Sequence, residues 1–240
     1  MLINKDSCID CGICVSRCPV SAIKEDTTEG IQIDLEVCLE CGVCKRWNIC
    51  PTESFYQQEL VYPRTVRHLM SDVLTIAPES GISGRGTEEM KTNEVTGRFK
   101  PGFIGIAIEM GRPGIGTRLG DVEKIAQAVI SEGVEFEKDN PITTMMADTK
   151  TGKFKDELLN ERCLSAIIEF GIAEEKAPNV LKIIQDVSTQ IETVFSLCIA
   201  SKARPDGTIP HVKVVEDMGL WISPNGKHNL GLGKPVYKFD

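Results

Sequence analysis

Two cysteine-rich runs near the start of the chain constrain its structure more than any other feature. The first run spans residues 8–19 and the second spans residues 38–51. In each run three cysteines follow one another at intervals of three residues, and a fourth cysteine comes later, directly before a proline. Iron–sulfur clusters require thiolates at this spacing, three from one tight loop and a fourth from farther away. The cysteines are Cys8, Cys11, Cys14 and Cys18 in the first run and Cys38, Cys41, Cys44 and Cys50 in the second.

This tandem pattern, over residues 1–58, resembles the bacterial-type ferredoxin that carries two 4Fe–4S clusters. The resemblance implies a crossed assignment, in which the fourth cysteine of each run binds the other cluster. One cluster would take Cys8, Cys11, Cys14 and Cys50, and the other would take Cys38, Cys41, Cys44 and Cys18. The second run departs from the pattern because five residues, 45–49, precede its last cysteine, whereas the first run has three.

Structural zinc and disulfides are the alternatives to iron–sulfur clusters. A zinc site closes two separated cysteine pairs into one tetrahedron, whereas here three thiols crowd into seven residues twice, and a zinc site would leave thiols over. Disulfides are typical of secreted proteins, and the polar start of the chain, residues 1–7, is not typical of a signal peptide. The pattern therefore favours two 4Fe–4S clusters in the reducing cytoplasm of an anaerobic cell.

The charge of the chain indicates what kind of partner it has. The formal net charge of the whole chain is −8, and residues 1–58 hold nine acidic and five basic residues. Such a surface favours docking on a basic patch of a redox partner protein and disfavours nucleic acid, although a merely solvated acidic face is an equally good interpretation. No apolar run approaches the roughly 18–20 residues that a membrane-spanning helix needs.

The 41% hydrophobic content is enough for a second core after the cysteine repeat. Residues 59–100 are interpreted as a linking helix, over about 60–75 and ended by Pro78, followed by a long Gly-rich loop with one short helix within 87–98. Residues 204–240 are interpreted as a helix at 210–218 and an extended Gly-rich tail.

Between these segments, residues 101–203 show a strand–helix–strand–strand–helix–strand pattern. Strands are predicted at 103–110, 134–136 with 142–147, 162–172 and 192–200, and helices at 119–130 and from Pro178. This order is the split βαββαβ topology, and it loosely resembles small ligand-binding domains of the ACT kind. The fold class is therefore α+β, with a dicluster ferredoxin domain, a βαββαβ sandwich and a C-terminal tail.

A second candidate site follows the strand that ends at Met110. The glycine-rich turn over residues 111–120 lies between a predicted strand and a predicted helix, which is an anion cradle in principle. It matches neither the P-loop nor the dinucleotide fingerprint, so nucleotide binding is rejected. A small carboxylate or phosphate could be held by Arg112, Thr117 and Arg118 together with backbone amides. Tight turns or a subunit contact are the commoner use of such motifs.

The remaining reactive side chains give weaker indications. We interpret Cys163 and Cys198 as small buried hydrophobes on strands, and Trp47 as a cover that excludes water from a cluster, with a docking anchor as the alternative. The histidines, which suggest surface or satisfied polar roles rather than catalysis, are His68, His211 and His228.

No acid–base or nucleophile set stands out, so no catalytic residue is assigned and no activity of the chain alone is predicted. The favoured hypothesis is an iron–sulfur electron-transfer protein that is a subunit or dedicated partner of a larger oxidoreductase, with an oligomer also open. The alternatives are a redox enzyme subunit, or a redox-gated regulator, that binds a small anion in its C-terminal domain.

Overall fold

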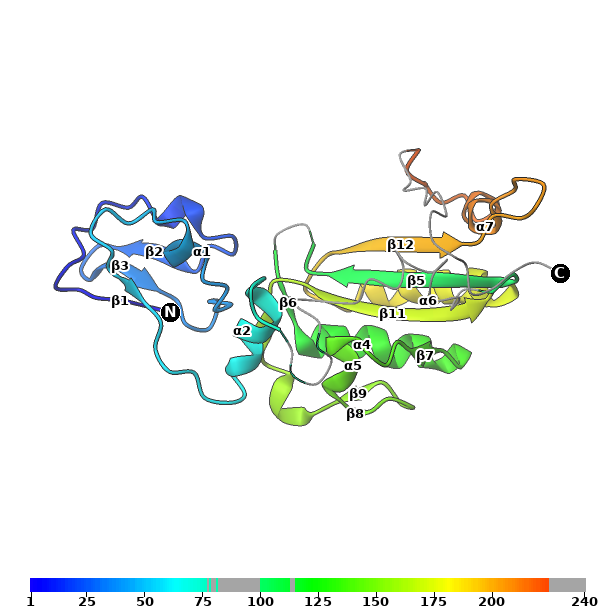
Figure 1. Ribbon diagram of the computed structural model, residues 1–240, viewed down its shortest axis with the longest axis horizontal. Coiled ribbons are helices and arrows are strands. Elements are labelled where there is room, and N and C mark those ends of the chain that lie inside the picture. The colour runs from blue at the N-terminus through cyan, green and yellow to red at the C-terminus, as the bar shows by residue number, and fades with distance from the viewer. Residues whose placement is uncertain (77, 79–80, 82–99, 113–114, 225–240) are drawn as a thin grey trace.

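The computed structural model describes residues 1–76, 78, 81, 100–112 and 115–224. Figure 1 shows two bodies along the long axis of the molecule, with helix α2 between them. The predicted short helix within 87–98, and the Gly-rich tail from 225 onward, fall outside the described residues. Among the described residues, no helix is long and apolar enough to cross a membrane.

The N-terminal body consists of two small antiparallel sheets and two short helical turns. Strand β1 pairs with β4, and β2 pairs with β3 through the turn at residues 27–29. Met1, Ile23, Ile31 and Phe55 are buried and form the small core together with Cys14. The elements are β1 (Leu2–Ile3), η1 (Val15–Arg17), β2 (Ile23–Asp26), β3 (Gly30–Ile33), α1 (Val43–Arg46) and β4 (Phe55–Tyr56).

Helix α2 (Thr65–Ser71) is shorter than the predicted linking helix. The expectation that Pro78 ends it is wrong, because the backbone is already extended at Asp72, whose carboxylate accepts a hydrogen bond from the Leu74 amide. Val66 and Met70 of this helix are buried, whereas Val73 and Leu74, which follow its end, are exposed.

The C-terminal body is built on a four-stranded sheet. Its spatial order is β12-β5-β11-β7, and all neighbouring strands are antiparallel. The chain forms β5 (Phe103–Met110), α4 (Leu119–Val129) and β7 (Glu135–Phe136), and later β11 (Ala166–Ala173), α6 (Ala177–Ser188) and β12 (Phe195–Ser201). Short elements occupy the connections: β6 (Thr117–Arg118), η2 (Ile130–Glu132), α5 (Pro141–Thr144), β8 (Met146–Asp148), β9 (Lys153–Phe154), η3 (Asp156–Leu158), β10 (Arg162–Cys163), η4 (Glu174–Lys176) and, after the sheet, α7 (Pro210–Asp217).

The main hydrophobic core lies between this sheet and the helices α4 and α6. Alternate residues of β5, from Ile104 to Met110, are fully buried, which is the period expected of a strand with one face on a core. The apolar faces of helices α4 and α6 pack against these residues. The two-residue period of the strand and the 3.6-residue period of the helices therefore mark the side chains of a single core. Met70 from α2 belongs to the same core and ties this helix to the C-terminal body.

Three sequence predictions in this body are wrong. Residues 142–144 form helix α5 rather than a strand, because Pro141 begins it and the Asn140 side chain accepts a hydrogen bond from the Ile142 amide. The strand predicted at 162–172 is divided into β10 and β11, and β10 pairs with β6 instead of the main sheet. Cys198 is exposed on β12, whereas Cys163 is buried as predicted.

Candidate metal centres

The two cysteine loops have the same backbone conformation. The residues between the first two cysteines, Asp10 and Glu40, have φ angles of 48° and 54°, and the glycines that follow, Gly12 and Gly42, have 73° and 69°. Left-handed residues of this kind reverse the chain locally, which lets three cysteines within seven residues turn toward a common space. The repeat in the sequence is therefore also a repeat in the backbone.

The fourth cysteine of each run is held by equivalent hydrogen bonds. The amide of Ala22 donates to Cys18 Sγ at 3.2 Å, and the amide of Ser54 donates to Cys50 Sγ at 3.3 Å. Burial opposes ionisation of the Cys50 thiol, but hydrogen bonds from Thr52 and Ser54 outweigh it and lower the pKa of Cys50 to about 7. The thiolate is the metal-binding form of cysteine, and these hydrogen bonds favour that form at Cys50.

The first group of thiols surrounds a pocket. Four cysteines line it, together with apolar residues that include Ile3, Ile31 and Phe55, and these four are Cys8, Cys11, Cys14 and Cys50. Burial, followed by repulsion from the thiols of Cys11, Cys50 and Cys8, raises the pKa of Cys14. Three of these cysteines come from the first run and one from the second run.

The second group gathers around Cys44. Burial, followed by repulsion from Cys41, Cys38 and Cys18, raises the pKa of Cys44 to about 12. The same neighbours act on Cys41, whose pKa is raised by burial first and then by Cys38 and Cys18. Three cysteines of this group come from the second run, and Cys18 comes from the first.

In the described part of the chain, no three His, Cys, Asp or Glu side chains are close enough to hold one metal ion together. The thiols of the first group instead stand around a shared volume with apolar walls. All ten cysteines are free thiols, so none of these donors is used in a disulfide.

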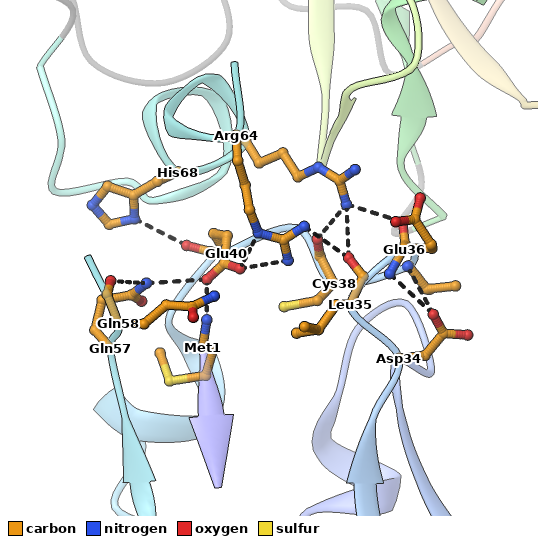
Figure 2. Close-up of polar contacts among 12 residues, drawn as sticks. Met1, Asp34, Leu35, Glu36, Cys38, Glu40, Gln57, Gln58, Arg64 and His68 are labelled. Atoms are coloured by element: carbon orange, nitrogen blue, oxygen red, sulfur yellow. Dashed lines mark hydrogen bonds and ion pairs between the residues drawn. The ribbon is translucent and has the colours of Figure 1, made fainter. Parts of the chain in front are cut away.

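A buried ionic network covers the second cysteine loop. Glu40 is only 1% exposed and accepts from the N-terminal ammonium of Met1, from Arg64 Nε at 2.8 Å and from Gln57. Figure 2 shows these groups converging on Glu40, with His68 reaching the Glu40 carbonyl oxygen at 3.0 Å. The burial of Glu40 would raise its pKa, but these hydrogen bonds outweigh it and lower the pKa.

Arg67 of helix α2 joins this loop to the C-terminal body. It is 3% exposed, and its Nη1 donates to three carbonyl oxygens of the loop, at 2.9–3.1 Å. Its Nε pairs with Glu161 of the C-terminal body. The three acceptors, labelled in Figure 2, are the carbonyls of Leu35, Glu36 and Cys38. The sequence pattern gives no indication of Arg64 or Arg67, because nothing in it separates them from solvated charges. For Glu40 the only signal is its position between two cysteines of the second run.

The second run forms helix α1 where the first run has the η1 turn, and the first two residues of the lengthened segment belong to this helix. Arg46, at its end, pairs with Asp72 just after α2 and donates to the Cys41 carbonyl oxygen at 2.6 Å. Trp47 is 64% exposed, so the prediction that it covers a cluster is wrong. Arg46 therefore connects the second cysteine loop to the residue that follows helix α2.

The three residues of the candidate anion site are not brought together by the contacts of the described residues. Arg112 pairs with Glu109, the Thr117 hydroxyl donates to the Arg118 carbonyl, and Arg118 donates to the Asn160 carbonyl. The first amides of α4, at positions 119 and 120, donate to backbone carbonyls of the segment 159–161. Residues 113–114 of the turn lie outside the described residues, and the anion site stays a prediction.

The glycine-rich turn instead contacts the second cysteine loop. A Cβ placed on Gly116 would lie 3.3 Å from Leu39 Cδ1 and 3.5 Å from Val20 Cγ1, and Gly116 has a φ of 79°. Leu39 lies between Cys38 and Cys41 of the second group, and Val20 follows the Cys18–Pro19 pair. This glycine permits close approach of the two bodies.

Comparisons with known proteins agree with the cysteine geometry. Residues 1–24 match the family described as the 4Fe-4S binding domain. A ferredoxin of Rickettsia felis is 53% identical over 32 residues, which are 13% of this chain and 29% of that protein. A ferredoxin of Alicyclobacillus acidocaldarius is 40% identical over 48 residues, 20% of this chain and 58% of that protein.

The N-terminal region is a ferredoxin-type 4Fe–4S module. A third relative, the pyruvate synthase subunit PorD of Methanocaldococcus jannaschii, is 32% identical over 53 residues, 22% of this chain and 59% of that protein. The chain spans less than two thirds of the length of each of these three relatives. No solved structure matches the chain.

Proposed function

We propose that this chain is a two-cluster electron-transfer protein. The first 4Fe–4S cluster is held by Cys8, Cys11, Cys14 and Cys50, and the second is held by Cys38, Cys41, Cys44 and Cys18. The observation that carries the proposal is the grouping of eight thiols into two sets of four, each with three thiols from one run and one from the other. When bound, each cluster accepts and releases one electron, and the chain holds, insulates and orients it.

We also propose two domains, at residues 1–58 and 101–203, of which the second has the βαββαβ topology. Residues 59–100 link the two domains, and residues 204–240 are the C-terminal helix and Gly-rich tail. The observed strand order, β12-β5-β11-β7, supports the second domain because it is the order of a split βαβ sheet. Arg67 and the Gly116 contact support a fixed attachment of the first domain to the second.

The attachment favours a subunit or dedicated partner of a larger oxidoreductase over a free carrier. A relative of the N-terminal region is named as a subunit of pyruvate synthase, which supports the same class of role here. We place the protein in the cytoplasm of an anaerobic cell, where eight thiolate ligands stay reduced. The acidic N-terminal domain favours a protein partner with a basic surface and disfavours nucleic acid.

Anaerobic purification tests this function. We expect about eight iron and about eight sulfide ions per chain, and two EPR signals after reduction by a low-potential donor. A protein that binds no iron, or that binds clusters which no low-potential donor reduces, would contradict the proposal. Co-purification from the native organism would then identify the partner.

A further inference from the structure

The second cluster site is surrounded by arginines in a way that the first is not. Arg67 Nη1 donates to the carbonyl oxygen of Cys38 at 3.0 Å, and Arg46 Nη2 donates to that of Cys41 at 2.6 Å. Both acceptors belong to ligand residues of the second group. Among the described residues, no Arg or Lys side chain donates to the carbonyl of Cys8 or Cys11, the equivalent residues of the first group.

The ion pairs around the second site leave an excess of positive charge. Four cations, the Met1 ammonium and the guanidinium groups of Arg46, Arg64 and Arg67, face three carboxylates, those of Glu40, Asp72 and Glu161. At the first site Lys5 donates to the Ile31 carbonyl oxygen, Asp10 accepts from the Ile31 amide, and Glu53 stands between two residues that line the pocket; all three charged side chains are exposed. Water screens exposed charges, whereas Arg67 is 3% exposed and acts through a less polar medium.

Reduction of a cluster by one electron adds one negative charge to it. A fixed positive charge stabilises that added charge, and it does so more strongly when the charge is buried and oriented by hydrogen bonds. Hydrogen bonds and charge around a cluster are among the factors that set its reduction potential. Arg67 lies outside the cysteine module, so helix α2 brings this influence to the second site only.

We propose that Arg67, assisted by Arg46, raises the reduction potential of the second cluster above that of the first, so that one electron received by the first cluster passes to the second. The first cluster is oxidised and the second is reduced in this step, and the original donor is a low-potential one-electron reductant outside the chain. Arg67 is a positioning residue in this proposal. The inference rests on the proposed function, because it requires both clusters.

Because Arg67 has a carboxylate partner, substitutions of the two residues should shift the potential of the second cluster in opposite directions. Arg67→Gln removes the buried positive charge and should lower the potential of the second cluster. Glu161→Gln leaves Arg67 in place but removes its counter-charge, so it should raise that potential. Damage to the fold would move both variants in the same direction, whereas electrostatic tuning moves them in opposite directions.

The experiment is an EPR-monitored redox titration of the full-length holoprotein and its variants. Iron and sulfide analysis comes first, because a wild-type chain without two clusters would contradict the proposed function rather than this inference. Cys18→Ala identifies the EPR signal of the second cluster. In the wild type, that signal should appear at the higher potential, and the reverse order or equal potentials would overturn the proposal.

For Arg67→Gln we expect the reduced-to-oxidised ratio of the second cluster to fall about tenfold at a fixed potential, which is ~59 mV for one electron. Arg46→Gln should change it in the same direction, and Glu161→Gln in the opposite one. Arg17→Gln is the matched control, since this arginine is exposed beside Cys18 and should change little. If Arg67→Gln prevents assembly of the second cluster, the proposal is tested by Glu161→Gln and Arg46→Gln alone. The proposal is overturned if neither variant shifts the potential of the second cluster, or if both shift it in the same direction.

Discussion

The two cysteine loops share a backbone but differ in what covers them. Leu39 and Ile9 occupy equivalent positions, between the first and second cysteines, yet Leu39 is 2% exposed and Ile9 is 63% exposed. The neighbouring acids differ in the same way, since Glu40 is buried in an ionic network and Asp10 is exposed. The difference shows that local sequence determines the geometry of a ligand loop, whereas distant residues determine its environment.

The largest expected effect is the loss of a whole cluster in a matched pair of cysteine variants. Cys18→Ala should remove the EPR signal of the second cluster and spare the first, because Cys18 gathers with Cys38, Cys41 and Cys44. Cys50→Ala should remove the first cluster and spare the second. If each substitution instead damaged the cluster of its own run, the crossed assignment would be wrong.

A second pair compares the two acids. Glu40→Ala would leave the buried Met1 ammonium and the half-buried Arg64 without their carboxylate, which should destabilise the protein by roughly 3–5 kcal/mol. Asp10→Ala loses a hydrogen bond from the Ile31 amide at an exposed position and should have a much smaller effect. Heat-induced unfolding and the rate of cluster bleaching, followed by visible absorption, measure both variants, and equal sensitivity would show that the cover over Glu40 is unimportant.

A third pair tests the apolar contact between the two bodies. Leu39→Ala should destabilise the holoprotein by about 3 kcal/mol, because it opens a cavity against Val20 and the Gly116 turn. Ile9→Ala at the equivalent exposed position should change stability by less than about 0.5 kcal/mol. Hydrogen exchange of the α2 amides should rise in the Leu39 variant alone; a similar rise in both would count against a fixed attachment.

The smallest expected effect concerns the lengthened loop. Trp47→Ala should change stability by at most about 0.5 kcal/mol, since this side chain is exposed. The potentials of both clusters should also stay unchanged in a redox titration. A clear loss of the second EPR signal would contradict the view that this exposed side chain has no part in holding the second cluster.

The sequence alone determined the backbone of the two cysteine loops, because the residues that set it lie close together in the chain. Cysteine spacing, the glycines Gly12 and Gly42, and the proline after each fourth cysteine act within a few residues of one another. Strand β5 and helices α4 and α6 were also predictable, since a single face of each repeats with the period of its element. Helix α5 was missed because a cap at Asn140 outweighed an apolar run that reads equally well as a strand.

Only the tertiary structure decided which cluster site faces the C-terminal body. Arg67 and Glu161 are separated by 94 positions in the chain, and neither stands in a motif. From sequence alone, a charged residue on a short helix is expected to be solvated. Burial of a charge requires partners, and the local sequence does not reveal them. The cysteine repeat is thus nearly symmetric in sequence, and the fold makes its two halves different.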